Sequence, residues 1–378
     1  MARRGHHEGS IYQRQDGRWA ASLTLGYVAG KRKRKTIYAA TQREVREQLM
    51  VARHIQQQGL PIANERQTTG QFLAHWLEES AKPTIRPKTY ASYAQLIRLH
   101  LAPELGRFAL TKLSPQAVQE LLNHKLAAGL SPRTVQYLHA VLRRALNQAV
   151  KWGLVPRNVA TLVDPPRVRR AEVRPFTLDE ARAFLVAVQG DRLQALYTVA
   201  LAMGLRQGEA LGLRWQDVDL EEGVLRVRVA LQRVDGRLQL VEPKSASSRR
   251  TIALPQIAAV TLRAHRAAQL QERLLAGERW QESGLVFTTR LGKPLIARNV
   301  FRSFQRVLAG AGISHQRFHD LRHTCATLLL AQGIHPRVVM EILGHSQIGL
   351  TMNTYSHVVP ALQKEAAGRM DDVLKSAR

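Results

Sequence analysis

A proline-rich, basic stretch at residues 164–175 constrains the folding of this chain more than any other feature of its sequence. Its twelve residues include three prolines and four arginines and follow neither helical nor strand periodicity. Because proline cannot continue a helix or the interior of a sheet, such a stretch predicts an interdomain linker. The polar residues 56–70, which contain Pro61, predict a second linker. The expected domains are residues 1–60, 67–163 and 174–378.

The first expected domain combines a small sheet with one helix. A capping box of Thr41 and Glu44 begins the helix, which continues with apolar residues at helical spacing. Turn residues at Asp16-Gly17 and near Gly30 separate three short strands. The strands are predicted at residues 10–14, 19–25 and 36–39.

A run of basic residues is predicted to lie at the second turn of this sheet. Such a run is often only a solvated loop. On a hairpin that fits a nucleic-acid groove, however, we expect it to contact DNA. The run consists of Lys31, Arg32, Lys33, Arg34 and Lys35.

The second expected domain carries helix signals only. Helices are predicted over residues 71–79 and 87–101, and two more begin at Ser114-Pro115 and Ser131-Pro132. The last of these runs to Trp152 and has one apolar and one basic face. We expect its basic face to bind DNA through Arg133, Arg143 and Arg144.

The third expected domain is mostly helical with one sheet. A capping box of Thr177 and Glu180 begins it. Strands are predicted over residues 225–231, 238–241 and 251–254, the first two joined by a turn at Asp235-Gly236. The chain as a whole is therefore expected to be mainly α with small β-sheets, in the α+β class.

The net charge of the chain limits the classes of partner that it is expected to bind. Lys and Arg number 56 against 29 Asp and Glu, which gives a net charge of +27. Nucleic acid is the first partner that this excess favours, and an anionic membrane surface is the second. No run of eighteen apolar residues occurs, and Met1–Ser10 carries no apolar segment of a signal peptide. With Cys325 as the single cysteine, we expect a cytoplasmic protein without a membrane partner.

Nucleotide and zinc chemistry find no support in the sequence. Neither a Walker-type phosphate loop, nor GxGxxG before a helix, nor HExxH occurs. Enzymes that depend on ATP, on a dinucleotide or on catalytic zinc are therefore disfavoured, and no cofactor and no metal are expected.

Arg206, between two glycines at a helix-to-helix turn, is a candidate phosphate ligand. An arginine in such a place is often a solvated helix cap. Glu209, three residues on, could hold the guanidinium rigid for a two-point contact with phosphate.

A second polar cluster opens an apolar helix. His319, Arg322 and His323 share one helical face. Zinc binding would need further ligands, and none is evident. In a purely structural alternative, one histidine caps the helix and the arginine pairs with Asp320.

Four sequence boxes occur in an order that resembles the tyrosine recombinase, or phage integrase, family. They are GLRQGEALGLRW, HDLRHTCATLLLAQG, LGHS and TYSHV. Residues 130–160 are similar to the family's helical core-DNA-binding domain. The basic N-terminal sheet is similar to an arm-site-binding domain of phage and conjugative-element integrases. The resemblance covers nearly the whole chain.

The resemblance implies a site-specific DNA recombinase that cleaves and rejoins DNA through a covalent 3′-phosphotyrosine. Tyr355 would be the nucleophile, and Arg206 and Arg322 would hold the non-bridging oxygens of the scissile phosphate. Lys244 would protonate the departing 5′ oxygen.

The remaining positions support these groups. His319 would assist proton transfer at the tyrosine, and His345 would donate a hydrogen bond to the phosphate. Glu209 would support the first arginine. Further implied partners are double-stranded DNA, a homotetramer on synapsed sites, a host DNA-bending protein and an excision factor, in a bacterial cytoplasm.

Elementary chemistry agrees with these roles. Two fixed arginines and a histidine stabilise the charge of a phosphoryl transition state without a metal. A tyrosine with a pKa near 10 needs a proton acceptor and positive surroundings to attack at pH 7. The covalent intermediate conserves the bond energy, so no ATP is needed.

Three alternatives remain. A type IB topoisomerase-like enzyme shares the chemistry but would not need an arm-type domain. A DNA-binding regulator that kept the fold is expected to lose at least one catalytic position, and none is lost here. An RNA-binding protein predicts aromatic stacking platforms, which a chain with 6% aromatic residues does not favour.

Overall fold

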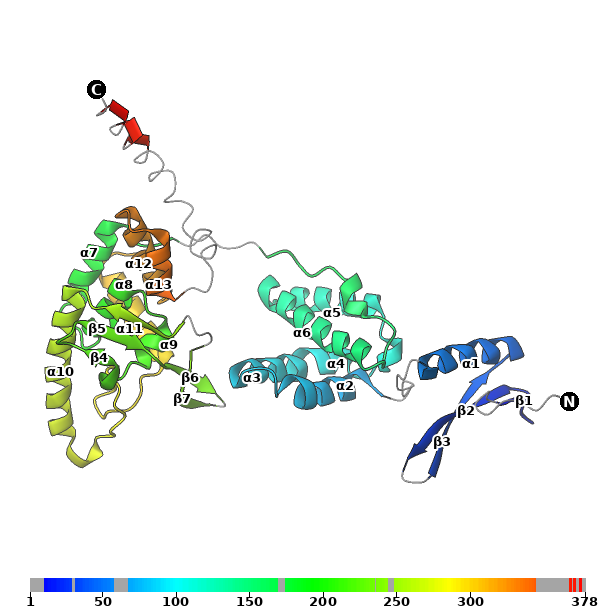
Figure 1. Ribbon diagram of the computed structural model, residues 1–378. Coiled ribbons are helices and arrows are strands. Elements are labelled where there is room, and N and C mark those ends of the chain that lie inside the picture. The colour runs from blue at the N-terminus through cyan, green and yellow to red at the C-terminus, as the bar shows by residue number, and fades with distance from the viewer. Residues whose placement is uncertain are drawn as a thin grey trace. The chain divides into compact units, whose positions relative to one another are not determined.

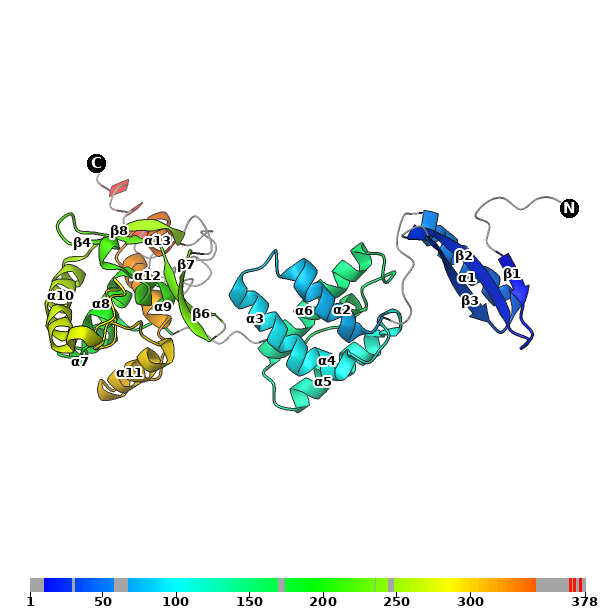
Figure 2. The same ribbon diagram turned by 90° about the horizontal axis from the view of Figure 1, so that it is seen from below.

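The computed structural model describes most of the chain (Figures 1 and 2). It divides into two compact units, an N-terminal unit of residues 1–170 and a C-terminal unit of residues 171–378. Helices predominate and the sheets are small and antiparallel, which confirms the predicted α+β class. None of the helices in the described part combines the length and the apolar character needed to span a bilayer. The described residues are 10–28, 31–57, 67–168, 174–234, 236–243, 248–344, 367–368, 370–371 and 374–375.

The N-terminal sheet has the strand order β1-β2-β3 and packs one face on a helix (Figure 2). Its core joins Leu23 and Ile37 of the sheet to Val45 and Leu49 of the helix, all four buried. The predicted capping box is confirmed, because Thr41 and Glu44 exchange backbone-to-side-chain hydrogen bonds. The elements are β1 (Ser10–Gln13), β2 (Trp19–Val28), β3 (Lys31–Ala39) and α1 (Gln42–Gln57).

The placement of the basic run at a turn was wrong. Lys31 to Lys35 belong to strand β3, whose pairing with β2 begins at Lys31 opposite Val28 and continues past a bulge between Thr24 and Gly26. The ladder is longer than expected because backbone hydrogen bonds pair these residues whatever their side chains. Since β3 is an edge strand, its Lys and Arg residues also disfavour pairing with another chain.

Helices are the main elements of residues 67–168, as predicted, beside one isolated β-bridge between Thr68 and Ala109. Ser114 and Ser131 cap their helices by accepting hydrogen bonds from the backbone N–H groups of Ala117 and Thr134. The core contains Phe72, Trp76, Leu138 and Leu142, among others. The helices are α2 (Thr69–Trp76), α3 (Pro87–Leu96), α4 (Ala102–Leu105), α5 (Pro115–Ala127) and α6 (Pro132–Lys151). Short π-helical segments, Leu77–Ala81 and Ile97–Leu101, extend α2 and α3, and 3₁₀ turns cover Leu110–Lys112 and Val159–Leu162.

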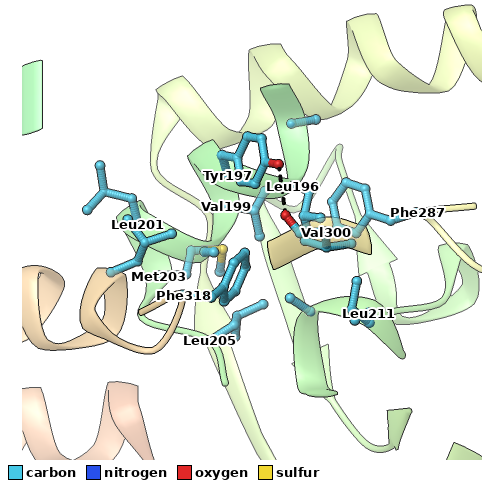
Figure 3. Packing of buried hydrophobic residues seen from close by; sticks show 14 of the residues in the cluster. Leu196, Tyr197, Val199, Leu201, Met203, Leu205, Leu211, Phe287, Val300 and Phe318 are labelled. Atoms are coloured by element: carbon cyan, nitrogen blue, oxygen red, sulfur yellow. Dashed lines mark hydrogen bonds between the residues drawn. The ribbon is translucent and has the colours of Figure 1, made fainter. Parts of the chain in front are cut away.

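The C-terminal unit is built around the buried helix α8 (Gln194–Met203). Tyr197 of this helix lies among the rings of Phe184, Phe304 and Phe318. Its hydroxyl donates to the carbonyl of Val300 at 3.5 Å (Figure 3), and burial raises the pKa of Tyr197 to about 12. The surrounding helices are α7 (Leu178–Ala187), α9 (Gln207–Leu211), α10 (Gln256–Ala276), α11 (Ala297–Gly310), α12 (Asp320–Ala331) and α13 (Pro336–Leu343). The predicted capping box of Thr177 and Glu180 opens α7.

The C-terminal unit contains two sheets in its described part, where one was predicted. The long strand expected at residues 225–231 breaks at residues 228–229, so that β5 joins one sheet and β6 the other. The start of β6 packs directly on α9, where a Cβ on Gly212 would lie 2.6 Å from the backbone nitrogen of Leu231. The strands are β4 (Val218–Asp219), β5 (Val224–Val227) and β8 (Arg250–Ala253) in the first sheet and β6 (Ala230–Val234) and β7 (Arg237–Val241) in the second. Two 3₁₀ turns, Trp215–Asp217 and Gly277–Arg279, complete the unit's described helical turns.

Candidate active site

Arg206 stands at the first residue before α9 and is held there by Glu209. Its Nη1 donates to Oε1 of Glu209 at 2.6 Å, and its backbone N–H donates to Oε2 at 3.1 Å. The ion pair expected from their spacing is therefore present. Glu209 is buried, with 4% of its side chain exposed, whereas 36% of the Arg206 side chain is exposed. The buried Glu209 thus fixes the arginine, whose exposed part remains accessible to a ligand from solvent.

Arg322 joins the second sequence box to the first. It is buried in α12, with 1% of the residue exposed, and its Nη1 donates to the carbonyl of Gly204 at 2.8 Å. Gly204 ends α8 in the left-handed conformation, with φ of 61°, two residues before Arg206. The structure therefore brings two distant arginine boxes to one turn of the backbone.

The structural alternative for the second box does not hold. Arg317, not Arg322, pairs with Asp320, with Nη2 2.7 Å from Oδ1. His319 lies at the start of α12 but makes no capping hydrogen bond with its side chain. Its ring stands perpendicular to that of His323, with 5.0 Å between centroids.

The environment of His319 keeps its ring neutral. Although His319 is exposed as a residue, its pKa is lowered to about 4, first by desolvation of the ring and then by the nearby His323, Arg322 and Arg206, whose combined effect exceeds the opposing effect of Asp320. An imidazole with this pKa is unprotonated at pH 7 and can accept a proton. The three cationic or ionisable side chains Arg206, Arg322 and His319 thus act on one another at short range.

The start of the third box, at the end of α13, packs against the turn at Gly204 and binds Arg206. Helix α13 ends at Gly344, which has φ of 65° and whose carbonyl accepts a hydrogen bond from Nη2 of Arg206 at 3.0 Å. Leu343, the residue before it, packs against Gly204: a Cβ there would lie 2.5 Å from Leu343 Cδ2 and 3.3 Å from Cys325 Sγ. A residue with a Cβ at position 204 would be strained both by this φ and by the close approach of Leu343.

Arg250 was missed as a site residue by sequence reasoning. It opens β8 and is buried, with 7% of its side chain exposed. Its Nη2 donates to Oε2 of Glu209 at 3.0 Å and its Nε to the carbonyl of Ile342 at 2.6 Å. Its position at the start of a predicted strand, just beyond Lys244, was the available signal. We call Arg206, Arg250, Arg322 and Glu209 the arginine cluster.

Two guanidinium groups determine the ionisation of Glu209. Burial by itself raises the pKa of this carboxyl group, but Arg250 and Arg206 outweigh burial, so the pKa of Glu209 is lowered. Glu209 is therefore a carboxylate that balances two buried or half-buried cations.

Comparison with known proteins agrees with this geometry. Residues 175–361 match the model of the phage integrase family, and residues 68–126 match the N-terminal SAM-like domain of phage integrases. A tyrosine recombinase XerC-like protein of Caldanaerobacter subterraneus subsp. tengcongensis is 32% identical over 94% of this chain and 96% of its own length. The chain belongs to the phage integrase family of tyrosine recombinases. It is a site-specific DNA recombinase of the integrase type, and the topoisomerase and regulator alternatives are not favoured.

Solved integrases share the fold. The Tn1549 transposon integrase in complex with transposon right-end DNA has a TM-score of 0.68 at 22% identity, covering 79% of this chain and 99% of that one. A lambda integrase tetramer bound to a Holliday junction has a TM-score of 0.57 at 17% identity, covering 89% and 95%.

Several predicted site residues of this integrase lie outside the described residues. They are Lys244, His345 and Tyr355. Their described neighbours are Pro243 and Ser248 on either side of the first, and Gly344 directly before the second. In the described residues, no group of three or more His, Cys, Asp or Glu side chains could hold a metal ion.

The predicted DNA-binding residues of the integrase fall on two surfaces of the N-terminal unit. Arg133, Arg143 and Arg144 are exposed on α6, opposite its buried apolar face. Arg144 donates to the hydroxyl of Tyr93 at 3.2 Å. Of the basic run, Lys31–Lys33 are described by their backbone in β3, and Arg34 is exposed.

Proposed function

We propose that the arginine cluster and His319 form the phosphate-binding part of a recombinase active site that uses Tyr355 as nucleophile. One observation carries the proposal: Arg206 of the first sequence box and His319 and Arg322 of the second converge on the turn at Gly204. Such a convergence of fixed cations suits a phosphodiester whose transition state gathers negative charge on its oxygens.

The proposed cleavage step needs neither metal nor nucleotide. The phenolic oxygen of Tyr355 attacks the scissile phosphorus and its proton passes to the neutral imidazole of His319. The bond to the 5′ oxygen breaks, and Lys244 protonates that oxygen. Arg206, Arg322 and His345 stabilise the non-bridging oxygens. A free 5′ hydroxyl then attacks the phosphotyrosine by the reverse route, so the bond energy is kept.

We further propose that the chain is divided by task. Residues 1–60 would bind arm-type DNA sites, residues 67–163 would bind core sites, and residues 174–378 would carry the chemistry. The DNA complex of the Tn1549 integrase and the lambda integrase tetramer on a Holliday junction support double-stranded DNA as substrate and a homotetramer on synapsed sites. A host DNA-bending protein, an excision factor and a bacterial cytoplasm complete this proposal.

A covalent-adduct assay tests the chemistry. Suicide substrates made from the DNA that flanks the coding region are incubated with the chain in EDTA and without nucleotide, and a denaturing gel detects protein-linked DNA. The wild type should form the adduct, whereas Tyr355→Phe should bind DNA equally well and form none. An adduct with the Phe variant, or a strict magnesium requirement for cleavage, contradicts the proposal.

A truncation tests the division by task. Without residues 1–60, adduct formation at core sites should persist, while protection of distant arm sites and recombination that depends on DNA looping should be lost. Identical footprints and salt dependence for the full and truncated chains would instead assign this segment to nonspecific binding.

A further inference from the structure

Arg250, at the start of the edge strand β8, bonds to two segments distant in sequence and to the preceding loop. Its Nη2 donates to Glu209 Oε2 at 3.0 Å, its Nε to the Ile342 carbonyl at 2.6 Å and its Nη1 to the Ser248 carbonyl at 3.1 Å. With 7% of its side chain exposed, this cation is desolvated, and its removal leaves Glu209 buried with less compensation.

These contacts coincide with the segments that carry the proposed catalytic groups. Glu209 holds Arg206. Ile342 lies two residues before Gly344, whose carbonyl also binds Arg206. Ser248 directly follows the residues 244–247 that contain Lys244. Arg250 is therefore connected to Arg206 by two routes, through a carboxylate and through the end of α13.

The division of Glu209 between its partners explains why a second arginine matters. Oε1 accepts from the Arg206 guanidinium, and Oε2 accepts from the Arg206 backbone and from Arg250. If Arg250 is removed, Arg206 becomes the remaining arginine on a buried carboxylate. Its guanidinium is then drawn toward Glu209 and away from the Gly344 carbonyl and from a phosphate.

We propose that Arg250 is a positioning residue for DNA cleavage, which acts through Glu209 and the end of α13 to hold the Arg206 guanidinium in place for the scissile phosphate. This inference rests on the proposed role of Arg206. It assigns no contact between Arg250 and DNA.

The test compares three suicide substrates under single-turnover conditions at saturating DNA. The first has a normal scissile phosphate. The second has a methylphosphonate, which lacks a non-bridging negative charge, and the third has a 5′-bridging sulfur, whose thiolate leaves without a proton. Arg250→Met should cut the normal substrate about 100-fold more slowly than the wild type, with an unchanged DNA dissociation constant. Its defect should largely disappear on the methylphosphonate and persist on the sulfur substrate.

Matched variants separate positioning from folding. Arg249→Met makes the same change at the neighbouring arginine, whose side chain is 55% exposed and pairs with Glu242, and should cleave normally. Arg250→Lys keeps the charge but not the fork, and should show the same substrate pattern with a defect of about 10-fold. If Arg250→Met does not fold, Arg250→Lys decides the question.

Other outcomes overturn the inference. Rescue by the sulfur substrate alone would mean that Arg250 acts on Lys244, and equal defects on all substrates with a lowered melting temperature would mean a structural role only. A wild type that forms no adduct, or a Tyr355→Phe variant that does, would refute the proposed function itself. Normal cleavage by Arg250→Met beside an active wild type would refute this inference alone.

Discussion

The arginines of the cluster and the arginines of α6 belong to one chain but experience opposite surroundings. In the cluster, Arg322 and Arg250 are buried and bound to backbone carbonyls, and Glu209 ties Arg250 to Arg206. On α6, Arg143 and Arg144 are exposed. A buried arginine with fixed partners can define the position of one phosphate, whereas an exposed one contributes attraction to many. We therefore expect substitutions in the cluster to change the cleavage rate and substitutions on α6 to change DNA affinity.

The largest effect is expected from Arg322→Gln. The amide keeps a donor but loses the charge and the fork, so cleavage at saturating DNA should fall about 10³-fold, with DNA affinity nearly unchanged. Single-turnover adduct formation and a binding titration measure the two quantities. Arg182→Gln, at an arginine whose side chain is 70% exposed and pairs with the exposed Asp179, is the control and should cleave normally. Parallel losses of cleavage and affinity would erase the distinction between the two arginine groups.

Gly204→Ala tests the turn on which the cluster depends. The added Cβ meets Leu343 Cδ2 at 2.5 Å and requires an unfavourable φ of 61°. We expect a loss of about 2–4 kcal/mol in the free energy of unfolding of the C-terminal unit, together with slower cleavage. Denaturant titration measures the first quantity and the adduct assay measures the second. Gly223→Ala has φ of 65° and nothing within 4 Å, so it measures the backbone strain alone. Equal losses in both variants would show that the contact with Leu343 is unimportant.

Arg143→Ala combined with Arg144→Ala should act on affinity. If each side chain neutralises one phosphate, the slope of log affinity against log salt should become shallower by about 2 in total. Cleavage at saturating DNA should be unchanged. A titration over salt concentration measures the slope, and Arg273→Ala, an exposed arginine paired with Glu282, is the control. A reduced cleavage rate at saturation would assign α6 a part in the chemistry.

The smallest effect concerns pH. The pKa of His319 is lowered to about 4 in the folded chain, while an unfolded histidine titrates near 6.5. The unfolded state therefore takes up this proton first, so the stability linked to His319 is complete above pH 6.5 and is lost progressively as the pH falls toward 4. His319→Gln should lose less unfolding free energy than the wild type between pH 7 and pH 5. Denaturant titrations that stay parallel across this range would contradict the lowered pKa.

Local signals predicted the capped helix starts of both units, although α10, α11 and α13 were not predicted. The caps at Thr41, Ser114, Ser131 and Thr177 were predicted and are present, because a cap depends on residues three positions apart. The pairing of Arg206 with Glu209 was predictable for the same reason. Two features of the strands could not be predicted in this way. The break at residues 228–229 goes with the packing of β6 on α9, and the extension of β3 through Lys31 depends on backbone pairing with β2.

The sequence by itself determined the α+β class, the capped helix starts, the basic character and the order of the four boxes, all of which depend on composition and on neighbours along the chain. The tertiary structure alone decided that Arg322 binds the carbonyl of Gly204 and that Arg250 shares Glu209 with Arg206. These contacts join residues 118 and 41 positions apart. No local pattern encodes them, because burial fixes a partner for each desolvated charge only after the helices and strands have packed.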